Sequence, residues 1–410
     1  MNIIYNILIY LTSLVLKVIA LFNHKIKLGV KGRANTFNSL KNEIKKDDKT
    51  LWFHCASLGE YEQGLPVFNV LRKDYPKHKI VLTFFSPSGY EIRKNTPFAD
   101  VVVYLPLDTQ SNAKQFIKLV NPELTVFVKY EIWPNYLNEI KKNGLRAILI
   151  SAVFRKDQSF FKWYGTQTKQ ALFAFEHIFT QNEASKNLLE SIGYKTATVS
   201  GDTRFDRVLN QLQIDNTLDF IETFKEDKLC IVIGSSWPED EAILVPYINQ
   251  CKHDVKFIIA PHNIKAKQID SLKQSLKKET VLFSNKENSN LKNANIFIVD
   301  TIGILSKIYS YADIAYVGGA MGTTGLHNIL EPAVFGVPII IGSNHKKFPE
   351  AQAMIDHSNV FSVNDFSSLK NKLDLLIDNK TVREETGEKS FNFVKEKEGA
   401  VIQIVKFLRK

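Results

Sequence analysis

Short apolar runs separated by amphipathic stretches dominate the chain after residue 50. In the first half these runs are residues 51–56, 79–85, 100–105, 124–128, 146–150, 177–180 and 196–200. The pattern restarts in the second half with residues 229–234, 255–260, 294–299, 313–319 and 337–341. Short buried strands that alternate with helices are typical of βαβ units. The pattern therefore predicts an α/β protein with two doubly wound parallel sheets, each with helices on both faces.

The same pattern predicts how the chain is divided. With 410 residues it is too long for one ordinary domain. A charged stretch without strands separates the two series of apolar runs and is expected to be a linker. The predicted parts are an N-terminal anchor helix at 1–24, a Rossmann-like domain at 25–206, the linker at 207–228, a second Rossmann-like domain at 229–380, and a C-terminal helical segment at 381–410.

The N-terminal run is the longest apolar stretch of the chain. Four polar residues interrupt residues 3–22, namely Asn6, Thr12, Ser13 and Lys17. A helix of this length measures about 30 Å, which is enough to cross a bilayer core. The basic residues that follow it are Lys25, Lys27, Lys31 and Arg33. They place the rest of the chain on the cytoplasmic side of a membrane. Because Asn6, Ser13 and Lys17 share one helical face, a helix lying in the membrane interface is an open alternative to a spanning one.

Charge and composition limit the partners. The net charge is +10, and residues 24–49 alone hold eight Lys or Arg against three Asp or Glu. Such a surplus suits nucleic acid, an anionic membrane surface or a phosphorylated substrate. Nucleic acid is disfavoured, because the charge clusters beside the anchor and no DNA- or RNA-reading motif is found. The three cysteines are far apart and match no metal spacing, and no Asp-x-Asp pair stands out, so no essential metal or other cofactor is expected.

Candidate functional residues of the first half follow the predicted strands. In parallel sheets ligands bind beyond the carboxyl ends of the strands, and two facing sheets predict a site in the cleft between domains. Glu60 follows run 51–56 and either takes a proton from a hydroxyl or closes a capping box with Ser57. Glu131 follows run 124–128, where it is catalytic or simply favours the start of the next helix. Arg204 follows run 196–200 and pairs with an anionic substrate or with a surface carboxylate.

The second half offers candidates for a nucleotide site. After run 229–234, Ser236 is predicted to cap a helix whose free amides could hold a phosphate beside Ser235. Pro261 and His262 form a turn after run 255–260. Glycines that allow close approach of a ligand, or that simply form turns, are expected at Gly303 and at the end of run 313–319.

The stretch from Gly325 to Pro332 is the most specific element. Pro332 is tolerated only in the first turn of a helix, so that helix is predicted to begin near Asn328. Asn328 and Glu331 then lie on one face. Helix amides there could bind a phosphate while Glu331 accepts hydrogen bonds from two ribose hydroxyls; an ordinary capped helix is the alternative.

Five motifs together carry a family resemblance. In order they read ASLGE at 56–60, YEIWPN at 130–135, GDTRFD at 201–206, VGG at 317–319 and HNILEP at 327–332. In this order, behind an apolar helix, the chain resembles the lipid A 3-deoxy-D-manno-octulosonic acid (Kdo) transferases from about Leu51 to Glu350. The resemblance implies a GT-B fold, CMP-Kdo as donor and a lipid A precursor of the lipid IVA type as acceptor. It also implies an inverting glycosyltransferase of lipopolysaccharide core biosynthesis at the bacterial inner membrane, with its catalytic domains on the cytoplasmic side.

The resemblance also assigns roles to residues. Glu60 matches the family's proton acceptor, and Glu131 and Arg204 match positions that stabilise the transition state. Including the glycines and serines above, the donor-site residues expected are Ser235, Ser236, Pro261, His262, Ile302, Gly303, Ile304, Gly318, Gly319, Asn328, Ile329, Leu330 and Glu331. The basic, aromatic stretch 155–164 is expected to meet lipid phosphates or acyl chains, or else to form a solvated helix face.

The chain departs from the family pattern at several positions. The usual Pro-Arg-His is Pro261-His262-Asn263 here, which removes a basic contact or moves it elsewhere. Ile304 stands where an acidic residue is common, and Leu326 replaces a glycine. Two alternatives stay open, namely a GT-B enzyme that uses a UDP-sugar on another lipid, and a membrane-tethered nucleotide-binding protein without catalysis.

Overall fold

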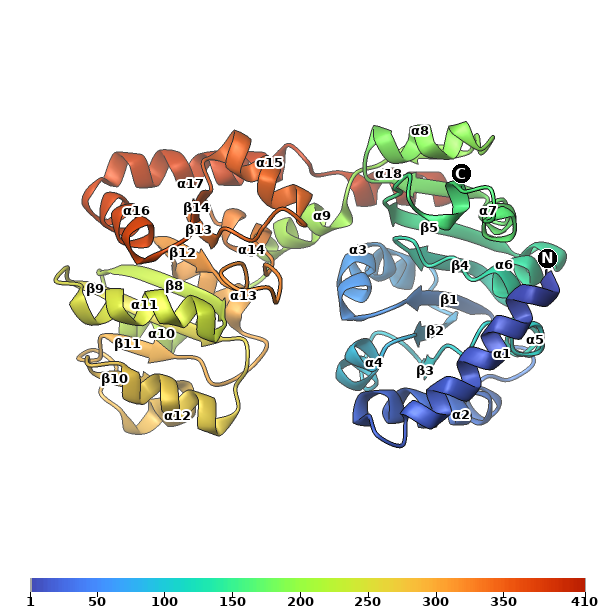
Figure 1. Ribbon diagram of the computed structural model, residues 1–410, viewed down its shortest axis with the longest axis horizontal. Coiled ribbons are helices and arrows are strands. Elements are labelled where there is room, and N and C mark those ends of the chain that lie inside the picture. The colour runs from blue at the N-terminus through green and yellow to red at the C-terminus, as the bar shows by residue number, and fades with distance from the viewer. Residues whose placement is uncertain (1, 410) are drawn as a thin grey trace. The chain divides into compact units, whose positions relative to one another are not determined.

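The computed structural model describes residues 2–409, and the chain divides into two compact units (Figure 1). Unit 1 consists of Met1–Arg207 together with Gly399–Lys410, and unit 2 consists of Val208–Glu398. The stretch expected to be a linker carries two short helices and falls mostly in unit 2. The expected C-terminal helical segment is divided, because its last helix returns to unit 1.

A seven-stranded parallel sheet forms the centre of unit 1, in the order β3-β2-β1-β4-β5-β6-β7. Its strands are β1 Thr50–Cys55, β2 Lys79–Phe84, β3 Val101–Tyr104, β4 Pro122–Val128, β5 Arg146–Ala152, β6 His177–Thr180 and β7 Ala197–Val199. Phe53 on β1 is paired with Leu82 on β2 and with Val126 on β4. The strand order reverses between β1 and β4, which is where open α/β sheets bind their ligands.

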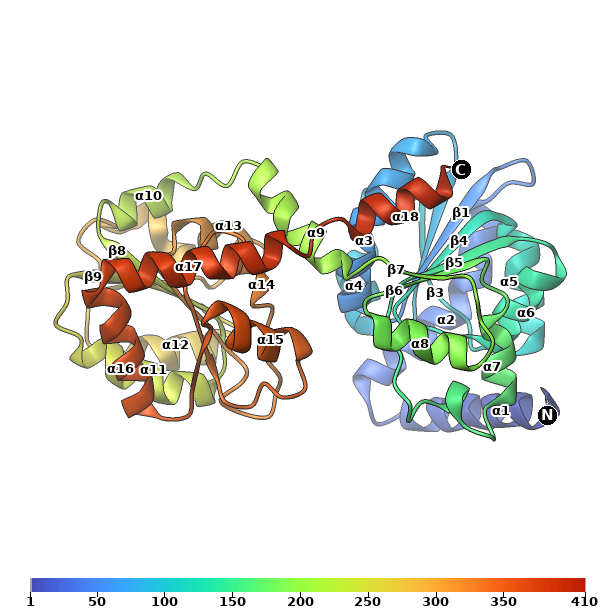
Figure 2. The ribbon, with the colours of Figure 1, turned by 90° about the horizontal axis from the view of Figure 1, so that it is seen from above.

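Helices cover both faces of this sheet. They are α1 Asn2–Ile19, α2 His24–Glu43, α3 Leu58–Asp74, α4 Pro87–Arg93, α5 Gln110–Val120, α6 Pro134–Lys142, η1 Ser159–Phe161, α7 Thr166–Leu172, α8 Glu183–Ser191, α9 Thr203–Leu209 and α18 Ala400–Leu408. Figure 2 shows α18, in red, beside α3, in blue, and these two helices are in contact.

Unit 2 repeats the architecture with a second parallel sheet in the order β10-β11-β9-β8-β12-β13-β14. Its strands are β8 Leu229–Ser236, β9 Val255–Pro261, β10 Thr280–Leu282, β11 Ile296–Ile298, β12 Ile314–Val317, β13 Ile339–Gly342 and β14 Phe361–Val363. Its helices are η2 Asn210–Gln213, α10 Asp219–Lys225, α11 Pro238–Gln250, α12 Ala266–Ser275, η3 Phe283–Asn288, α13 Leu305–Ile308, η4 Tyr309–Tyr311, α14 Leu330–Ala333, α15 Pro349–Ser358, α16 Phe366–Asp378 and α17 Lys380–Lys395. The prediction of two doubly wound parallel sheets is confirmed.

Strand alternation builds two cores on the faces of the first sheet. Leu51, Phe53 and Cys55 on β1 point to the core that α3 and α18 cover. Trp52 points to the opposite core, which α5, α6 and α7 complete. Successive side chains of a strand face opposite sides, so His54 lies on the same face as Trp52. β1 therefore brings an imidazole to the end of the strand on the Trp52 face.

Asp206, the last residue of the GDTRFD motif, joins the C-terminal helix to unit 1. Its Oδ1 accepts hydrogen bonds from the amide of Gly399 at 3.1 Å and from that of Val401 at 3.4 Å. These amides lie at the start of α18, where helix N–H groups lack partners within the helix. Asp206 therefore has a structural role that the sequence motif did not reveal.

Helix α1 lies against unit 1 through one face and leaves the other exposed. The less exposed positions recur every three or four residues and are Tyr5, Asn6, Ile9, Ser13, Leu16 and Ala20. The exposed apolar side chains of α1 and the turn after it are Ile3, Ile4, Ile7, Leu8, Tyr10, Leu11, Leu14, Val15, Val18, Ile19, Leu21 and Phe22. No helix within residues 2–409 combines the length and apolar character needed to cross a membrane.

Asp108 connects α1 to the start of α6. Its carboxylate accepts hydrogen bonds from the Tyr5 hydroxyl at 2.7 Å and from the amides of Asn135 and Tyr136, both at 3.1 Å. The Asn135 side chain also donates to Asn6 at 3.0 Å. Asp108 thus caps α6 from a distant loop, in place of a capping side chain at Trp133.

The pKa of Asp108 gives a prediction for stability. Burial raises this pKa from 3.8 to about 6, against the three hydrogen bonds, which lower it. A carboxyl whose pKa is higher in the folded state contributes stability that is present below its unfolded pKa and is lost as the pH rises through about 6. The Asp108→Asn variant lacks this titration. The wild type should therefore lose on the order of 2 kcal/mol relative to the variant between about pH 4 and pH 7, measured by urea unfolding. An equal gap at both pH values would show that Asp108 titrates alike in the folded and unfolded chain.

Candidate active site

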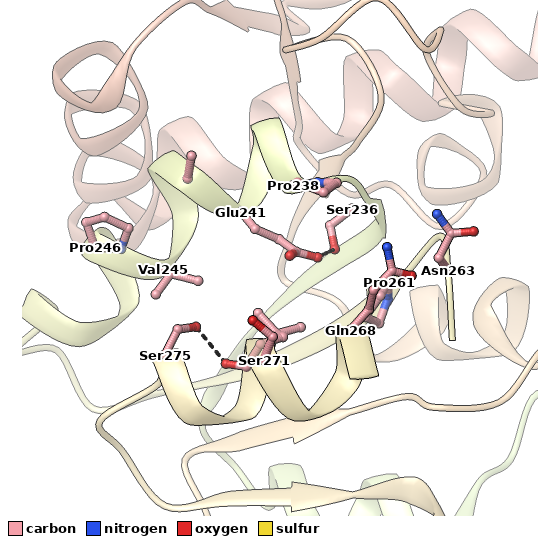
Figure 3. A pocket seen from close by; sticks show the side chains of 12 residues that line it. Ser236, Pro238, Glu241, Val245, Pro246, Pro261, Asn263, Gln268, Ser271 and Ser275 are labelled. Carbon is pink, nitrogen blue, oxygen red and sulfur yellow. Dashed lines mark hydrogen bonds between the residues drawn. The ribbon is translucent and has the colours of Figure 1, made fainter. Parts of the chain in front are cut away.

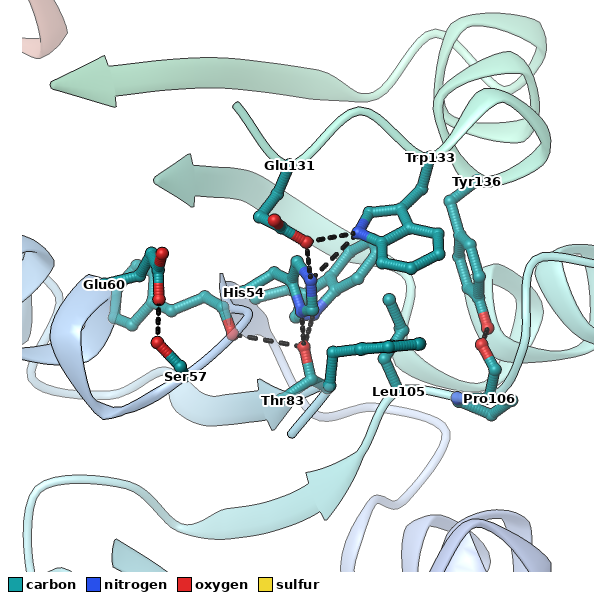
Figure 4. Close-up of polar contacts among 12 residues, drawn as sticks. His54, Ser57, Glu60, Thr83, Leu105, Pro106, Glu131, Trp133 and Tyr136 are labelled. Atoms are coloured by element: carbon teal, nitrogen blue, oxygen red, sulfur yellow. Dashed lines mark hydrogen bonds and ion pairs between the residues drawn. The ribbon is translucent and has the colours of Figure 1, made fainter. Parts of the chain in front are cut away.

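Glu60 lies where the chain leaves β1 and enters α3. Ser57 is the N-cap of α3, and its hydroxyl donates to the Glu60 carboxylate rather than capping the helix with its oxygen (Figure 4). The Glu60 side chain is buried, with 9% of its surface exposed. A carboxylate at a strand end, aligned by a neighbouring hydroxyl, is suited to accept a proton.

Glu131 lies at the end of the neighbouring strand β4. Its Oε2 accepts a hydrogen bond from the Trp133 indole Nε1 at 3.1 Å and is 3.5 Å from Nε2 of His54. The carboxylate is thus held by side chains, and α6 begins only three residues later, at Pro134. The pKa of the Cys55 thiol, at the end of β1, is raised first by burial and then by the negative charges of Glu60 and Glu131. Both carboxylates therefore lie near this thiol. The two predicted carboxylates therefore gather at the ends of adjacent strands.

Arg204 follows β7 and pairs with a carboxylate of its own segment. Its Nε and Nη2 both lie 2.8 Å from Oδ2 of Asp202. The other oxygen of Asp202 accepts a hydrogen bond from Gln63 on α3 at 2.8 Å, one turn beyond Glu60. The guanidinium side chain keeps 33% of its surface exposed. Arg204 therefore forms the salt bridge that the sequence analysis gave as one of two alternatives, and Asp202 connects it to α3. Its exposed surface remains accessible to an anion.

Three residues with positive φ lie at or directly after strand ends in this region of each unit. They are Lys129 after β4 (φ 72°), Ser151 in β5 (φ 52°) and Ser235 in β8 (φ 55°). Residues other than glycine rarely adopt this conformation, which costs on the order of 1 kcal/mol, and those that do so tend to cluster at functional sites. Lys129 and Ser235 thus lie at strand ends that carry candidate residues, whereas Ser151 lies in β5, which carries none of the candidate catalytic residues.

In unit 2 the ends of β8, β9 and β12 come together. The His262 amide donates to the Ser236 carbonyl at 2.9 Å, and the Gly318 amide donates to the Gly234 carbonyl at 2.9 Å. A Cβ atom on Gly318 would lie only 2.5 Å from the Ser235 carbonyl oxygen, so this position requires glycine. Ser235, Ser236, His262 and Gly318 therefore form one group, as predicted from their strand-end positions.

The helix cap after β8 differs from the prediction. Ser236 is the last residue of β8, and Trp237 is the N-cap of α11. The Trp237 amide donates to Asp240 at 2.9 Å, and the Ser236 hydroxyl donates to Glu241 at 2.9 Å. Asp240 was not distinguished by the sequence analysis because a carboxylate in the first turn of a helix is common. It also accepts the amide of Gly319 at 2.8 Å, which joins α11 to the end of β12.

Three aromatic rings pack against one another beside this group, one pair stacked and the other tilted. The Trp237 indole lies 4.2 Å from the His262 ring at an interplanar angle of 18°, and the His262 and His327 centroids are 4.7 Å apart. Trp237 Nε1 donates to Nε2 of His327 at 3.3 Å. Burial, and then His262, lowers the pKa of His327 to about 4, and burial lowers the pKa of His262. At neutral pH the two imidazoles are therefore uncharged and do not replace the arginine that is missing at position 262.

Glu331 is held by side chains from two segments. Its carboxylate accepts hydrogen bonds from the Ser306 hydroxyl at 2.9 Å and from the side-chain Nδ2 of Asn328 at 3.2 Å. The predicted start of this helix near Asn328 was wrong, because α14 begins at Leu330 and has four residues. Asn328 instead forms a turn in which its side chain accepts the Leu330 amide at 3.2 Å. A helix of one turn has little dipole, so the carboxylate is the main feature of this segment.

Residues 302–304 lie immediately before α13, which carries Ser306. Gly303 has φ 93°, and Ile302 is 75% exposed. Ile304 is the N-cap of α13 and packs against the core cluster that includes Ile308 and Tyr309. Residues 302–304 are therefore connected to Glu331 through α13, whose Ser306 donates a hydrogen bond to that carboxylate. The residues of the group that sequence reasoning missed are Trp237, Asp240, Ser306 and His327.

A cavity of about 420 Å³ borders this group (Figure 3). Ser236 and Pro261 are the predicted donor-site residues among those that line it. The remaining lining residues are Pro238, Glu241, Ala242, Val245, Pro246, Asn263, Gln268, Ser271, Leu272 and Ser275. Most of these belong to α11 and α12, so the cavity adjoins the predicted nucleotide residues without including Glu331 or Gly318.

The fold places the chain in a structural class. A UDP-N-acetylglucosamine 2-epimerase from Neisseria meningitidis, solved bound to UDP-GlcNAc, aligns with a TM-score of 0.61 at 16% identity and covers 88% of this chain and 100% of that one. MurG of Acinetobacter baumannii aligns with a TM-score of 0.55 at 12% identity over 88% of this chain and 99% of that one. Two units, each built on a doubly wound parallel sheet, give the chain a GT-B fold.

The sequence matches then show which family within this class the chain resembles. Residues 30–207 match the family model described as 3-deoxy-D-manno-octulosonic-acid transferase (kdotransferase). The Kdo transferase of Haemophilus influenzae is 28% identical over 377 residues, which cover 88% of this chain and 86% of the relative. That of Chlamydophila psittaci is 29% identical and covers 75% of this chain and 72% of the relative. These matches confirm the resemblance to the Kdo transferases that the five motifs indicated. This chain is a relative of the Kdo transferases, which are glycosyltransferases.

Proposed function

We propose that the protein transfers Kdo from CMP-Kdo to a hydroxyl of a lipid A precursor, with inversion at the anomeric carbon. The observation that carries the proposal is the pair of carboxylates at the ends of β1 and β4, the buried Glu60 and the largely buried Glu131, in a unit that matches the Kdo transferase model. The reaction belongs to lipopolysaccharide core biosynthesis.

The mechanism we assign is a single displacement. Glu60 takes the proton from the acceptor hydroxyl, whose oxygen forms the bond to the anomeric carbon of Kdo. The bond from that carbon to the phosphate oxygen breaks, and CMP leaves with the electron pair. Glu131 and Arg204 stabilise charge that develops in the transition state. Arg204 retains exposed surface for this role beyond its salt bridge with Asp202.

The donor is assigned to the group in unit 2. The Glu331 carboxylate accepts hydrogen bonds from the ribose hydroxyls. Gly318 and Gly319 let the backbone around the end of β12 pack closely, because a Cβ atom on Gly318 would lie 2.5 Å from the Ser235 carbonyl oxygen and one on Gly319 would lie closer still to the Gly325 carbonyl oxygen. The remaining donor-site assignments are those made from the sequence.

The acceptor and the location are assigned from unit 1. Helix α1 presents apolar side chains on the face opposite to its contact with α6. Trp163 is 91% exposed and Tyr164 is 59% exposed in the basic stretch 155–164, which also carries Lys156 and Lys162. Apolar side chains next to lysines are suited to an anionic membrane surface and a phosphorylated lipid. We therefore place α1 in the plane of the bacterial inner membrane, on its cytoplasmic side.

The direct test of the function is product formation. Incubation with a CMP-Kdo generating system and lipid A precursor should give a product heavier by one or more Kdo units in mass spectrometry. Glu60→Gln keeps the size of the side chain but cannot take the proton, so turnover should fall at least about 100-fold. Glu62 pairs with Arg93 and Arg207, so Glu62→Gln is a matched control that should lower thermal stability more than turnover. A Glu60→Gln enzyme with normal turnover would remove the proposed base.

The donor site is tested by nucleotide binding. CMP should protect the wild type from thermal unfolding by about 2.7 kcal/mol at a hundredfold excess over its dissociation constant. Glu331→Ala should lose most of this protection, while Ser306→Ala, which removes one hydrogen bond to Glu331, should lose less. A cytidine nucleotide without ribose hydroxyls should protect both proteins equally poorly. Equal protection by UMP would assign the site to a UDP-sugar instead.

Membrane association is tested with vesicles that contain anionic lipid. Leu11, Leu14 and Val18 on α1 are each more than half exposed. Replacing all three by Ser should weaken co-sedimentation with vesicles more than tenfold, because each buried aliphatic side chain is worth about 1.5 kcal/mol or more. Ile92→Ser removes an exposed isoleucine of α4 and should leave binding unchanged. Equal binding by the triple variant and the wild type would rule out α1 as the anchor.

A further inference from the structure

His327 lies where the ends of three strands of unit 2 meet, and the mechanism above does not use it. Its amide donates to the Gly318 carbonyl at 3.1 Å, and its ring centroid is 4.7 Å from that of His262. A Cβ atom on Gly319 would lie 3.3 Å from the ring carbon Cδ2, so the ring also lies directly beside this glycine. The three neighbours all belong to the proposed donor site. The ring of His327 is therefore at the carboxyl edge of the sheet, where parallel sheets bind their ligands.

The hydrogen bond at Nε2 fixes the protonation of this ring. Trp237 Nε1 donates to Nε2 of His327 at 3.3 Å. An indole nitrogen is only a donor, so Nε2 is the acceptor and carries no proton. The indole itself is held by stacking on His262, at 4.2 Å and 18°. Burial, and then His262, lowers the pKa of His327 to about 4, so the ring is neutral at neutral pH. A neutral imidazole has one ring proton, which here resides on Nδ1.

The N–H at Nδ1 is a donor without a partner in the protein. Within residues 2–409 no hydrogen bond reaches this nitrogen, and the side chain is half-buried. Such a donor requires an acceptor from the solvent or from a ligand. The strongest acceptors on a nucleotide are its phosphate oxygens, because they are charged. The phosphate is bonded to the same ribose whose hydroxyls are assigned to Glu331, later in the same motif.

We propose that His327 binds the phosphate of the donor nucleotide through Nδ1–H, and that Trp237 is a positioning residue that selects this tautomer. The contact is a neutral donor of fixed direction, in a group whose two histidines cannot supply a positive charge. The proposal rests on the proposed function, because the phosphate is that of CMP-Kdo.

Two substitutions of His327 separate the ligand contact from packing. Asn places its amide nitrogen near the position of Nδ1 and can still donate to the phosphate. Gln reaches the position of Nε2, where its oxygen accepts the Trp237 proton, but it leaves Nδ1 unreplaced. By calorimetry, His327→Asn should keep the CMP dissociation constant within about threefold of the wild type, and His327→Gln should raise it about 10- to 100-fold, the scale of one hydrogen bond to a charged group. Equal losses in both variants would overturn the contact.

Cytidine and a second histidine are the controls for this experiment. Cytidine lacks the phosphate, so it should bind the wild type, His327→Asn and His327→Gln equally. A loss of cytidine binding in His327→Gln as large as the loss of CMP binding would show that the ring does not bind the phosphate. His357→Gln replaces an exposed histidine of α15 and should leave CMP affinity unchanged.

The role of Trp237 is tested by removing only its N–H. Trp237→Phe keeps a ring to stack on His262 but lets the His327 proton move to Nε2. CMP affinity should then fall about two- to fivefold, because only a fraction of the rings keeps the binding tautomer. In a His327→Gln background the same change should cost little further affinity, since its effect passes through Nδ1. Additive losses would contradict the positioning role.

The ring ¹⁵N spectrum of His327 tests the tautomer without any nucleotide. It should show the proton on Nδ1 in the wild type and a shift toward Nε2 in Trp237→Phe. A wild-type proton on Nε2 would refute the proposal. Added CMP should move the Nδ1 resonance, and added cytidine should not. If CMP does not bind the wild type, the proposed function fails; UMP and uridine then test the phosphate contact in the same way, and absence of any difference between them would overturn it.

Discussion

The direction of the strands is the constraint on which both sites depend. In each sheet all strands run parallel, so their carboxyl ends meet at one edge and whatever follows them is brought together. Motifs separated by about 70 residues, at Glu60 and Glu131, become neighbours because β1 and β4 are adjacent. In unit 2 the same rule joins Ser236, His262 and Gly318. No long loop is needed to assemble either group.

This constraint also explains how much the sequence could predict. The alternation of apolar runs and helices is a local pattern, so both sheets and the strand-end position of nearly every candidate residue followed from it. The start of α14 was misplaced because its segment folds into an Asn328 turn followed by a single helical turn. The cap of α11 was misplaced by one residue because β8 extends through Ser236. Such short-range choices depend on side-chain partners that the pattern does not specify.

Contacts between distant segments could not be predicted from the sequence. The Asp206 carboxylate was read as part of a functional motif, yet it accepts amides of a helix almost 200 residues later in the chain. Asp108 was not noticed at all, although it caps α6 and holds α1. Neither partner follows from spacing, because each depends on which loops the fold brings together. The same holds for Ser306, which reaches Glu331 from the preceding βα connection.

The arrangement around Glu131 illustrates how a parallel sheet links its core to its site. The strand that ends at Cys55 places Trp52 in the core and His54 one pleat nearer the carboxyl edge, on the same face. A polar ring at that depth is acceptable only if both nitrogens are satisfied, and Thr83 on the neighbouring strand satisfies the inner one. The outer nitrogen then faces the carboxylate that follows β4. Strand pairing in the core thus fixes the ring against which the Trp133 indole lies, and the same indole N–H donates to Glu131 at 3.1 Å. A loop carrying Glu131 alone would lack that support, because a surface loop has no packed partner to hold the carboxylate in one orientation.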